Sequence, residues 1–169
     1  MNVVGLKLHN VGDFDGISAS IYCSGCCHNC KGCHNKVTQN CNHGEPLNET
    51  HMLQLHQCLD NDYVENLVLC GGEPFMHYNI SDMMYIVRDV LHHHPTKRIV
   101  AFSGFTYEQI ISNPQQKQLL ELCDVLIDGK FILELYSPAL RFRGSSNQRI
   151  ISVKDSLASN KVIELTQYY

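Results

Sequence analysis

The sequence predicts an α/β protein with a mainly parallel β-sheet built from βα repeats. Short apolar runs of strand length alternate along the chain with segments in which apolar residues recur at helical spacing. Because parallel neighbours need a crossover connection, usually a helix, this alternation favours a parallel sheet with helices covering its faces. A chain of 169 residues has the length of one domain, so we expect a single domain over residues 1–169.

The first predicted elements surround a cysteine-rich loop. Ile17–Tyr22 (ISASIY) alternates apolar and small polar side chains, as a half-buried strand does, and the cysteines follow at once. A helix with apolar side chains on one face is predicted over Asn48–Leu59. The next strand is Asn66–Cys70 (NLVLC), and it ends at Gly71-Gly72.

The middle of the chain continues the same pattern. A helix is predicted to begin at Asn79 or Ser81 and to end before Pro95, and the strand Arg98–Phe102 (RIVAF) follows. The remaining expected elements are a short helix with a Thr106/Gln109 capping box, a helix opened by Asn113-Pro114, the strand Asp124–Ile127, and two strand candidates, Gln148–Val153 and Lys161–Leu165, joined by the polar segment KDSLASN.

Four loops are expected to meet at one edge of this sheet, because ligands of parallel α/β sheets bind beyond the carboxyl ends of the strands. These ends carry the cysteine loop, the Gly71-Gly72-Glu73-Pro74 turn, Ser103-Gly104 and Asp128-Gly129.

Composition excludes several classes of protein. Hydrophobic residues make up 44% and charged residues 18%, which is typical of a folded globular chain. With a net charge of -4 and no basic run, we expect no strong nucleic-acid binding. No apolar run reaches membrane-spanning length and the N-terminus does not have the pattern of a signal peptide, so we expect a cytoplasmic protein without membrane association.

Nine cysteines are the unusual feature, and five of them fall within the eleven residues CSGCCHNCKGC that begin at Cys23. Such crowding suggests thiolates gathered around a metal in a reducing compartment. Two overlapping registers are available, one that begins at Cys26 and one that begins at Cys27. The second matches the start of a ferredoxin run, but that run needs a fourth cysteine at position 37, where this chain has Val37.

Zinc is an alternative occupant, although the two C-x2-C pairs of this loop are too close together for an ordinary zinc ribbon. Nearby histidines could contribute to such a site, but we expect His28 and His43 to be solvent-exposed loop residues. The run of three histidines at 92–94 is expected at the solvated end of a helix, with a surface metal site as its second interpretation.

Three thiolates spaced C-x3-C-x2-C can hold three irons of a 4Fe-4S cluster and leave the fourth iron open to another ligand. An open metal position is what catalysis requires. An amine together with a carboxylate would fill it, which points to S-adenosyl-L-methionine as ligand and substrate.

This cysteine spacing after a first strand, with a GGEP turn after the second, resembles the radical SAM superfamily. Within it, five blocks resemble, in order and spacing, the activating proteins of anaerobic ribonucleoside-triphosphate reductases. The blocks are SGCCHNCKGCHN at 24–35, LCGGEPF at 69–75, AFSGFTYEQI at 101–110, DVLIDGKF at 124–131 and RGSSNQRI at 143–150.

The resemblance implies a partial, incomplete TIM barrel of the radical SAM type, with Cys26, Cys30 and Cys33 as ligands of the 4Fe-4S cluster and Cys23 and Cys27 outside it. It implies S-adenosyl-L-methionine contacts at these positions: Gly32, Cys33, His34, Gly71, Gly72 and, more weakly, Ser103 and Asp128. Glu73 is either a further contact or an ordinary turn acid.

The function implied is reductive cleavage of S-adenosyl-L-methionine and formation of a glycyl radical on the catalytic subunit of the reductase, with an electron donor such as a flavodoxin. No side-chain acid or base is expected to take part. The chain departs from the family pattern at His34, where an aromatic residue is usual, and in the DGISAS segment before the cysteine loop. The alternatives are an activating protein for another glycyl-radical enzyme and a zinc-binding interaction module.

Overall fold

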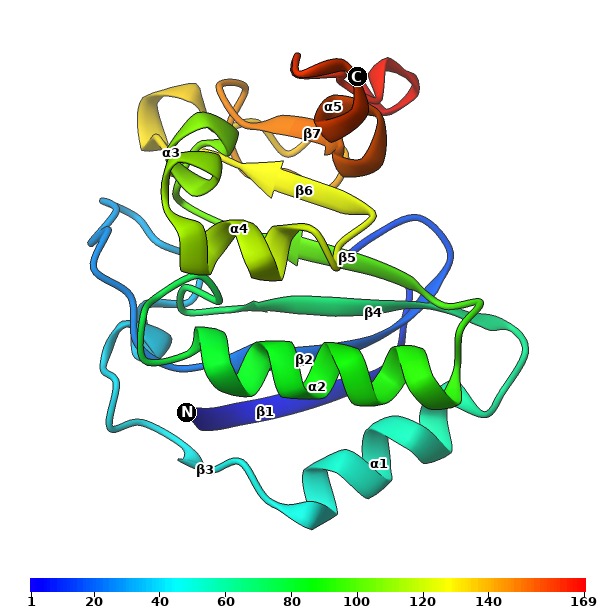
Figure 1. Cartoon of the computed structure of the whole chain (residues 1–169). Helices are drawn as coiled ribbons and strands as arrows, with labels where there is room; N and C mark the ends of the chain where they lie inside the picture. The colour runs from blue at the N-terminus through cyan, green and yellow to red at the C-terminus, as the bar shows by residue number, and fades with distance from the viewer.

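The computed structural model describes residues 1–169, whose strands form one seven-stranded sheet in the order β3-β1-β2-β4-β5-β6-β7 (Figure 1). The strands are β1 (Asn2–Asn10), β2 (Ile17–Cys23), β3 (Glu45–Pro46), β4 (Val64–Gly71), β5 (Arg98–Phe102), β6 (Val125–Asp128) and β7 (Arg149–Ser152). The central strands β2, β4, β5 and β6 pair in parallel, while β1 and β7 are antiparallel to their neighbours. The predicted α/β class with a mostly parallel sheet is therefore confirmed.

Five α-helices and three short 3₁₀ segments lie between and after these strands. They are α1 (Glu49–Leu59), α2 (Ile80–His93), α3 (Tyr107–Ser112), α4 (Pro114–Leu120), α5 (Val153–Ser159), η1 (Lys36–Gln39), η2 (Leu133–Leu135) and η3 (Thr166–Tyr168). The predicted capping box at the start of α3 is present, since the backbone N–H of Gln109 donates to Thr106 and the Gln109 side chain accepts from the Thr106 N–H. Each helix is too short or too polar to cross a membrane.

The structure differs from the sequence prediction at both ends of the chain. Strand β1 was not predicted, and the segment KDSLASN forms most of α5 instead of a loop. The expected strand Lys161–Leu165 is wrong, because this largely exposed segment makes a single bridge, from Glu164 to Ile151. An alternating apolar pattern shows that a segment could be a strand, but it does not supply the neighbour that a strand needs.

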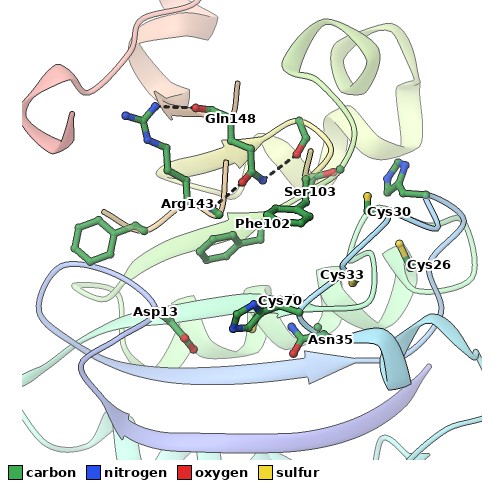
Figure 2. A pocket seen from close by; sticks show the side chains of 18 of the residues that line it. Asp13, Cys26, Cys30, Cys33, Asn35, Cys70, Phe102, Ser103, Arg143 and Gln148 are labelled. Atoms are coloured by element: carbon green, nitrogen blue, oxygen red, sulfur yellow. Dashed lines mark hydrogen bonds between the residues drawn. The ribbon is translucent and has the colours of Figure 1, made fainter. Parts of the chain in front are cut away.

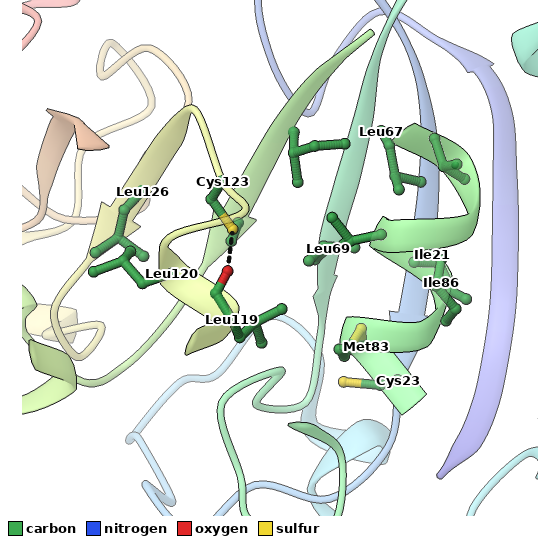
Figure 3. Close-up of a cluster of buried hydrophobic side chains, with 14 of the residues drawn as sticks. Ile21, Cys23, Leu67, Leu69, Met83, Ile86, Leu119, Leu120, Cys123 and Leu126 are labelled. Atoms are coloured by element: carbon green, nitrogen blue, oxygen red, sulfur yellow. Dashed lines mark hydrogen bonds between the residues drawn. The ribbon is translucent and has the colours of Figure 1, made fainter. Parts of the chain in front are cut away.

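Helices cover one face of the sheet, whereas both faces were expected to be covered. In Figure 1, α1, α2 and α4 lie on the same side of the strands. The larger core lies between these helices and the sheet, and Figure 3 shows Leu67 and Leu69 of β4 beside Met83 and Ile86 of α2. Because successive strand residues point to opposite faces, β4 also sends Val68 to the other side.

The helix-free face has a smaller core of its own, in which Val68, Val100 and Ile127 pack with Phe14 and Tyr168. The rest of this face is left open at the carboxyl ends of the parallel strands. The sheet does not close on itself, since β3 and β7 are its edge strands, and its assignment as a partial TIM barrel stays a prediction.

Candidate metal centre and cofactor cavity

A cavity of about 440 Å³ opens on the helix-free face of the sheet, at the carboxyl ends of β2, β4 and β5. Its lining includes residues from all four loops that were expected to meet there: the cysteine loop, Gly71-Gly72, Ser103-Gly104 and Gly129. Figure 2 shows Cys26, Cys30 and Cys33 on one side of the cavity and Arg143 and Gln148 on another. Its volume is in the range of small-molecule sites.

The cysteine loop takes its shape from three residues with left-handed backbone conformation, Gly25 (φ 86°), Asn29 (φ 47°) and Gly32 (φ 73°). Glycine and asparagine are the residues that adopt this region at least cost. Gly25 then ties the loop to its surroundings: its N–H donates to the Thr38 carbonyl at 2.6 Å, and its carbonyl accepts from the Glu73 N–H at 2.9 Å.

The thiols of Cys26, Cys30 and Cys33 are half-buried and line the cavity. Burial raises the pKa of the Cys26 thiol to about 11, so it is protonated near neutral pH until a metal displaces the proton. Cysteine thiolates are the ligands that hold iron–sulfur clusters, and these three come to one wall of the cavity.

The two neighbouring cysteines point elsewhere. Cys23 is fully buried in the larger core, where its sulfur accepts a hydrogen bond from the Asn79 side chain at 3.6 Å. Burial, with a contribution from the charge of Glu73, raises the pKa of Cys23 to about 12. Cys27 is exposed and is not part of the cavity lining. Of the two registers considered from the sequence, the one that begins at Cys26 therefore faces the cavity.

The carboxylate of Glu73 is completely buried and accepts four hydrogen bonds. Two come from backbone N–H groups, Phe75 at 3.1 Å and Gly104 at 2.7 Å, and a third from the Ser103 hydroxyl at 2.8 Å. The fourth partner is the His28 ring, whose Nε2 lies 2.7 Å from the carboxylate. Glu73 thus joins the cysteine loop to the ends of β4 and β5.

The position of His28 corrects the sequence prediction. A solvent-exposed loop residue was expected, but only 6% of the side chain is exposed. Its ring packs edge-on against Phe105 at 4.5 Å and pairs with Glu73. A buried carboxylate at the end of β4 gives this ring a polar partner that the loop sequence alone does not reveal. His43, by contrast, is exposed as predicted.

Gly71 and Gly72 line the cavity beside the cysteines, and both are required by the chain's own packing. A Cβ on Gly71, which has φ 104°, would lie 2.5 Å from the Cys23 carbonyl oxygen. A Cβ on Gly72 would lie 2.5 Å from the carbonyl oxygen of Gly25. Because backbone atoms cannot move aside easily, these glycines allow β4 to end directly against the cysteine loop.

The predicted cofactor contacts divide into two groups. Cys33, His34, Gly71, Gly72 and Ser103 line the cavity, whereas Gly32, Glu73 and Asp128 do not. The buried carboxylate of Asp128 accepts from the Tyr107 N–H at 2.7 Å and from the Arg149 side chain. Contact of any of these residues with a cofactor stays a prediction.

Sequence reasoning missed the side chains that form the floor of the cavity. Tyr22, Cys70 and Phe102 are at or next to the last residue of β2, β4 and β5 and point to the helix-free face. Burial raises the pKa of the Tyr22 hydroxyl, which donates to Asp13 at 2.7 Å. The alternation of side chains along each strand could have identified these residues, had the helix-free face been known.

Comparison with known proteins agrees with this geometry. A family model described as a 4Fe-4S single cluster domain matches residues 13–151. The anaerobic ribonucleoside-triphosphate reductase-activating protein of Escherichia coli K12 is 34% identical over 135 residues, which cover 79% of this chain and 86% of that protein. The proteins of the same name from Pasteurella multocida (34% over 152 residues, 89% and 96%) and from bacteriophage T4 (32% over 142 residues, 84% and 88%) are also similar.

Proposed function

Because this chain belongs to the family of anaerobic ribonucleoside-triphosphate reductase-activating proteins, with a 4Fe-4S domain, we propose that it is a radical SAM enzyme that generates the glycyl radical of that reductase. The observation that carries the proposal is the placement of three thiols, from Cys26, Cys30 and Cys33, on one wall of a cavity at the strand ends. Three ligands leave one iron of a 4Fe-4S cluster open for S-adenosyl-L-methionine.

A 4Fe-4S cluster held by Cys26, Cys30 and Cys33 would supply the electron for cleavage of the sulfur–C5′ bond of S-adenosyl-L-methionine, and the 5′-deoxyadenosyl radical released with methionine would take hydrogen from a glycine Cα. The protein's own residues bind and orient. Cys26, Cys30 and Cys33 would hold three irons. Through its contact with His28, Glu73 fixes the loop that carries these cysteines. The side chains of Tyr22 and Phe102 line the cavity and would cover one side of a bound cofactor.

For the cofactor contacts, we propose that Gly71, Gly72, Ser103 and His34 meet S-adenosyl-L-methionine directly, because all four line the cavity. Gly32 shapes the cysteine loop beside them, with its left-handed φ of 73°. Glu73 lies behind the wall and positions Ser103, whose hydroxyl donates to its carboxylate. Asp128 instead accepts from Tyr107 and Arg149, which lie outside the cavity lining.

The names of the relatives support the reductase as a partner, and the electron donor is inferred from the proposed chemistry. We propose that the chain acts on the catalytic subunit of an anaerobic ribonucleoside-triphosphate reductase and takes its electron from a donor such as a flavodoxin. Residues 1–169 would form one radical SAM domain with a partial TIM barrel. The nine free thiols fit a reducing cytoplasm, where we expect the protein to act.

The test is cleavage of S-adenosyl-L-methionine by protein reconstituted with iron and sulfide without oxygen and reduced with dithionite. Cys26→Ala, Cys30→Ala and Cys33→Ala should each abolish the brown absorption near about 400 nm, which is thiolate-to-iron charge transfer, together with the release of methionine. Cys27→Ala is the matched control and should retain both. Wild-type activity in the three cavity variants would refute the assignment. A colourless wild type whose bound zinc is lost in these three variants would favour the interaction module.

A second measurement tests the partner. The reconstituted protein, mixed with the reductase and S-adenosyl-L-methionine, should produce a glycyl radical that electron paramagnetic resonance detects. Cleavage of S-adenosyl-L-methionine without a radical on the reductase would point to a different glycyl-radical enzyme as partner.

A further inference from the structure

A second group of metal-binding side chains lies far from the cysteines, where α1 and α2 end. His56 comes from the last turn of α1, and Asp89 and His93 are one turn apart on α2. One ligand atom of each residue lies within 4.8 Å of the other two. Helix α2 begins after the carboxyl end of β4 and ends before the amino end of β5, so this cluster is at the opposite edge of the sheet from the cysteine loop (Figure 1).

We propose that His56, Asp89 and His93 form a second metal site, which binds a divalent first-row cation such as Zn²⁺ and links α1 to α2. Two imidazoles and a carboxylate are a ligand set that zinc commonly uses, with water in the fourth position. The sequence offered only the run of histidines at 92–94. The fold adds His56 from 36 positions before His92, and Asp89 from the preceding turn of the same helix.

The distances between the ligand groups are close to those of a bound ion. Nε2 of His56 lies 2.7 Å from Oδ2 of Asp89, and Nδ1 of His93 lies 3.7 Å from Oδ1 of the same carboxylate. Zinc with ligands at 2.0–2.2 Å in tetrahedral geometry separates its ligand atoms by about 3.3 Å. Small side-chain rotations, without movement of either helix, would therefore complete the site.

A neighbouring group holds the His56 imidazole in place. Nδ1 of His56 is 2.9 Å from Nε2 of His94, so it can donate to that ring while Nε2 of His56 binds the cation. Metal-binding histidines are typically oriented by such a contact of the second ring nitrogen. Nδ1 of His93, which lies 2.9 Å from the carbonyl oxygen of Asp89, would exchange this contact for the cation.

This site does not depend on the proposed function, and it affects how metal analyses of the protein are interpreted. Zinc found in a purified sample would have two candidate positions, and only its loss in the Cys26, Cys30 and Cys33 variants would assign it to the cysteine loop. The cluster also supplies a cross-link between two helices that pack side by side on the sheet.

The experiment is calorimetric titration of Zn²⁺ into the full chain with its iron–sulfur cluster loaded, so that iron occupies the cavity thiols. We expect one Zn²⁺ to bind per chain, and we expect His56→Ala, His93→Ala and Asp89→Asn each to weaken binding at least tenfold. His92→Ala is the matched control, because it changes the adjacent histidine outside the set and should leave the affinity unchanged. Saturating Zn²⁺ should also raise Tm by roughly 5 °C in the wild type and the control, but not in His93→Ala.

Equal Zn²⁺ affinity in wild type, His56→Ala and His93→Ala would overturn the proposal, as would an equal loss of affinity in His92→Ala. His93 is exposed, so its variant is expected to fold, and its Tm without metal reports whether it does. A chain that fails to load a cluster would contradict the proposed function only, since the same variants can then be compared in the metal-free chain.

Discussion

The carboxylate of Glu73 accepts hydrogen bonds from three separate segments, the cysteine loop, its own turn and the end of β5. A buried charge is costly unless hydrogen bonds replace the water it has lost, and here four donors do so. This one side chain therefore determines how the cysteine loop sits on the sheet. It acts through His28 and does not reach into the cavity itself.

We predict that Glu73→Gln destabilises the protein by about 1–3 kcal/mol. An amide has the same shape, but its NH₂ group would face a backbone N–H, either that of Gly104 or that of Phe75, and one of these donors would lose its acceptor. Urea denaturation of the metal-free protein measures the change.

The matched control for this prediction is Glu134→Gln, which makes the same substitution at an exposed carboxylate 3.4 Å from Lys31. Pairs in water contribute little, so the free energy of unfolding should stay within about 0.5 kcal/mol of wild type. Equal stabilities of the Glu73 and Glu134 variants would show that the buried hydrogen bonds do not hold the loop.

At the scale of single residues, the sequence predicts those site residues that are recognised by their spacing from nearby residues. Cys26, Cys30 and Cys33 are recognisable as candidate ligands because their characteristic spacing falls within eight residues. His28 was misjudged because its partner Glu73 is 45 positions away in the sequence. The role of a polar residue in a loop depends on what the fold brings against it, and no pattern near His28 contains that information.

Among the elements, β7 depends on more than its hydrogen bonds to β6. Arg149 of β7 reaches both Asp128 at the end of β6 and Glu108 in α3, with two hydrogen bonds to each carboxylate. Paired bonds of this kind combine charge with fixed geometry. The network joins the antiparallel edge strand to the parallel part of the sheet and to the helix-covered side.

We predict that Glu108 makes the stability of this network depend on acid pH. Its hydrogen bonds to Arg149 lower the pKa of Glu108 from 4.5 to about 2. A group whose pKa is lower in the folded state stabilises the fold above its unfolded pKa and loses that contribution as the pH falls through the folded value. Because Glu108 is 57% exposed, its contribution should be only about 1 kcal/mol.

The measurement compares wild type with Glu108→Gln by urea denaturation at several pH values. The difference in unfolding free energy should be constant above about pH 5 and should shrink as the pH approaches 2. Glu121→Gln removes an exposed partner of Lys117 and should show almost no difference at any pH. If the difference in unfolding free energy between wild type and Glu108→Gln did not change with pH, the role given to Glu108 would be contradicted.

The sequence predicts the elements that are stabilised by many buried apolar side chains, and it misses those that are not. The strands β4, β5 and β6 have almost entirely buried residues, so their apolar runs are unbroken in the sequence. Strand β1 is half exposed and contains Gly5, and its pairing with β2 stabilises it more than its composition does. Helix α5 has only two buried residues, Val153 and Ser156, too few to produce a helical pattern in a polar segment.

On the scale of the whole molecule, the two faces of the sheet have different structural roles. The face under α1, α2 and α4 supplies most of the core, while the other face ends in the cavity. The sequence could not show this asymmetry, because a strand buried on both faces looks the same whether a helix or a loop covers it. The other side is covered by segments outside the α-helices, and Tyr168 of η3 packs there in the smaller core.

Tyr168 is the second-last residue of the given sequence, yet it is only 7% exposed. Its ring packs edge-on against Phe14 and Phe142, with centroids 5.4 Å apart in each case. We predict that Tyr168→Ala destabilises the protein by about 3 kcal/mol, because it leaves a void beside the fully buried Phe14. Urea denaturation measures this cost, and the KM for S-adenosyl-L-methionine should rise as well, because Phe142 also lines the cavity.

Tyr85→Ala separates these effects from the general loss of a tyrosine, because Tyr85 is 56% exposed on α2, on the helix-covered side. Its unfolding free energy should stay within about 0.5 kcal/mol of wild type, with an unchanged KM. If Tyr168→Ala behaved like Tyr85→Ala, the C-terminal segment would be dispensable for sealing the open face, and the smaller core would have to be held by Phe14 and Phe142 alone. A stability loss with an unchanged KM would show instead that Phe142 keeps its place without Tyr168, so that the cavity wall and the core behind it are independent.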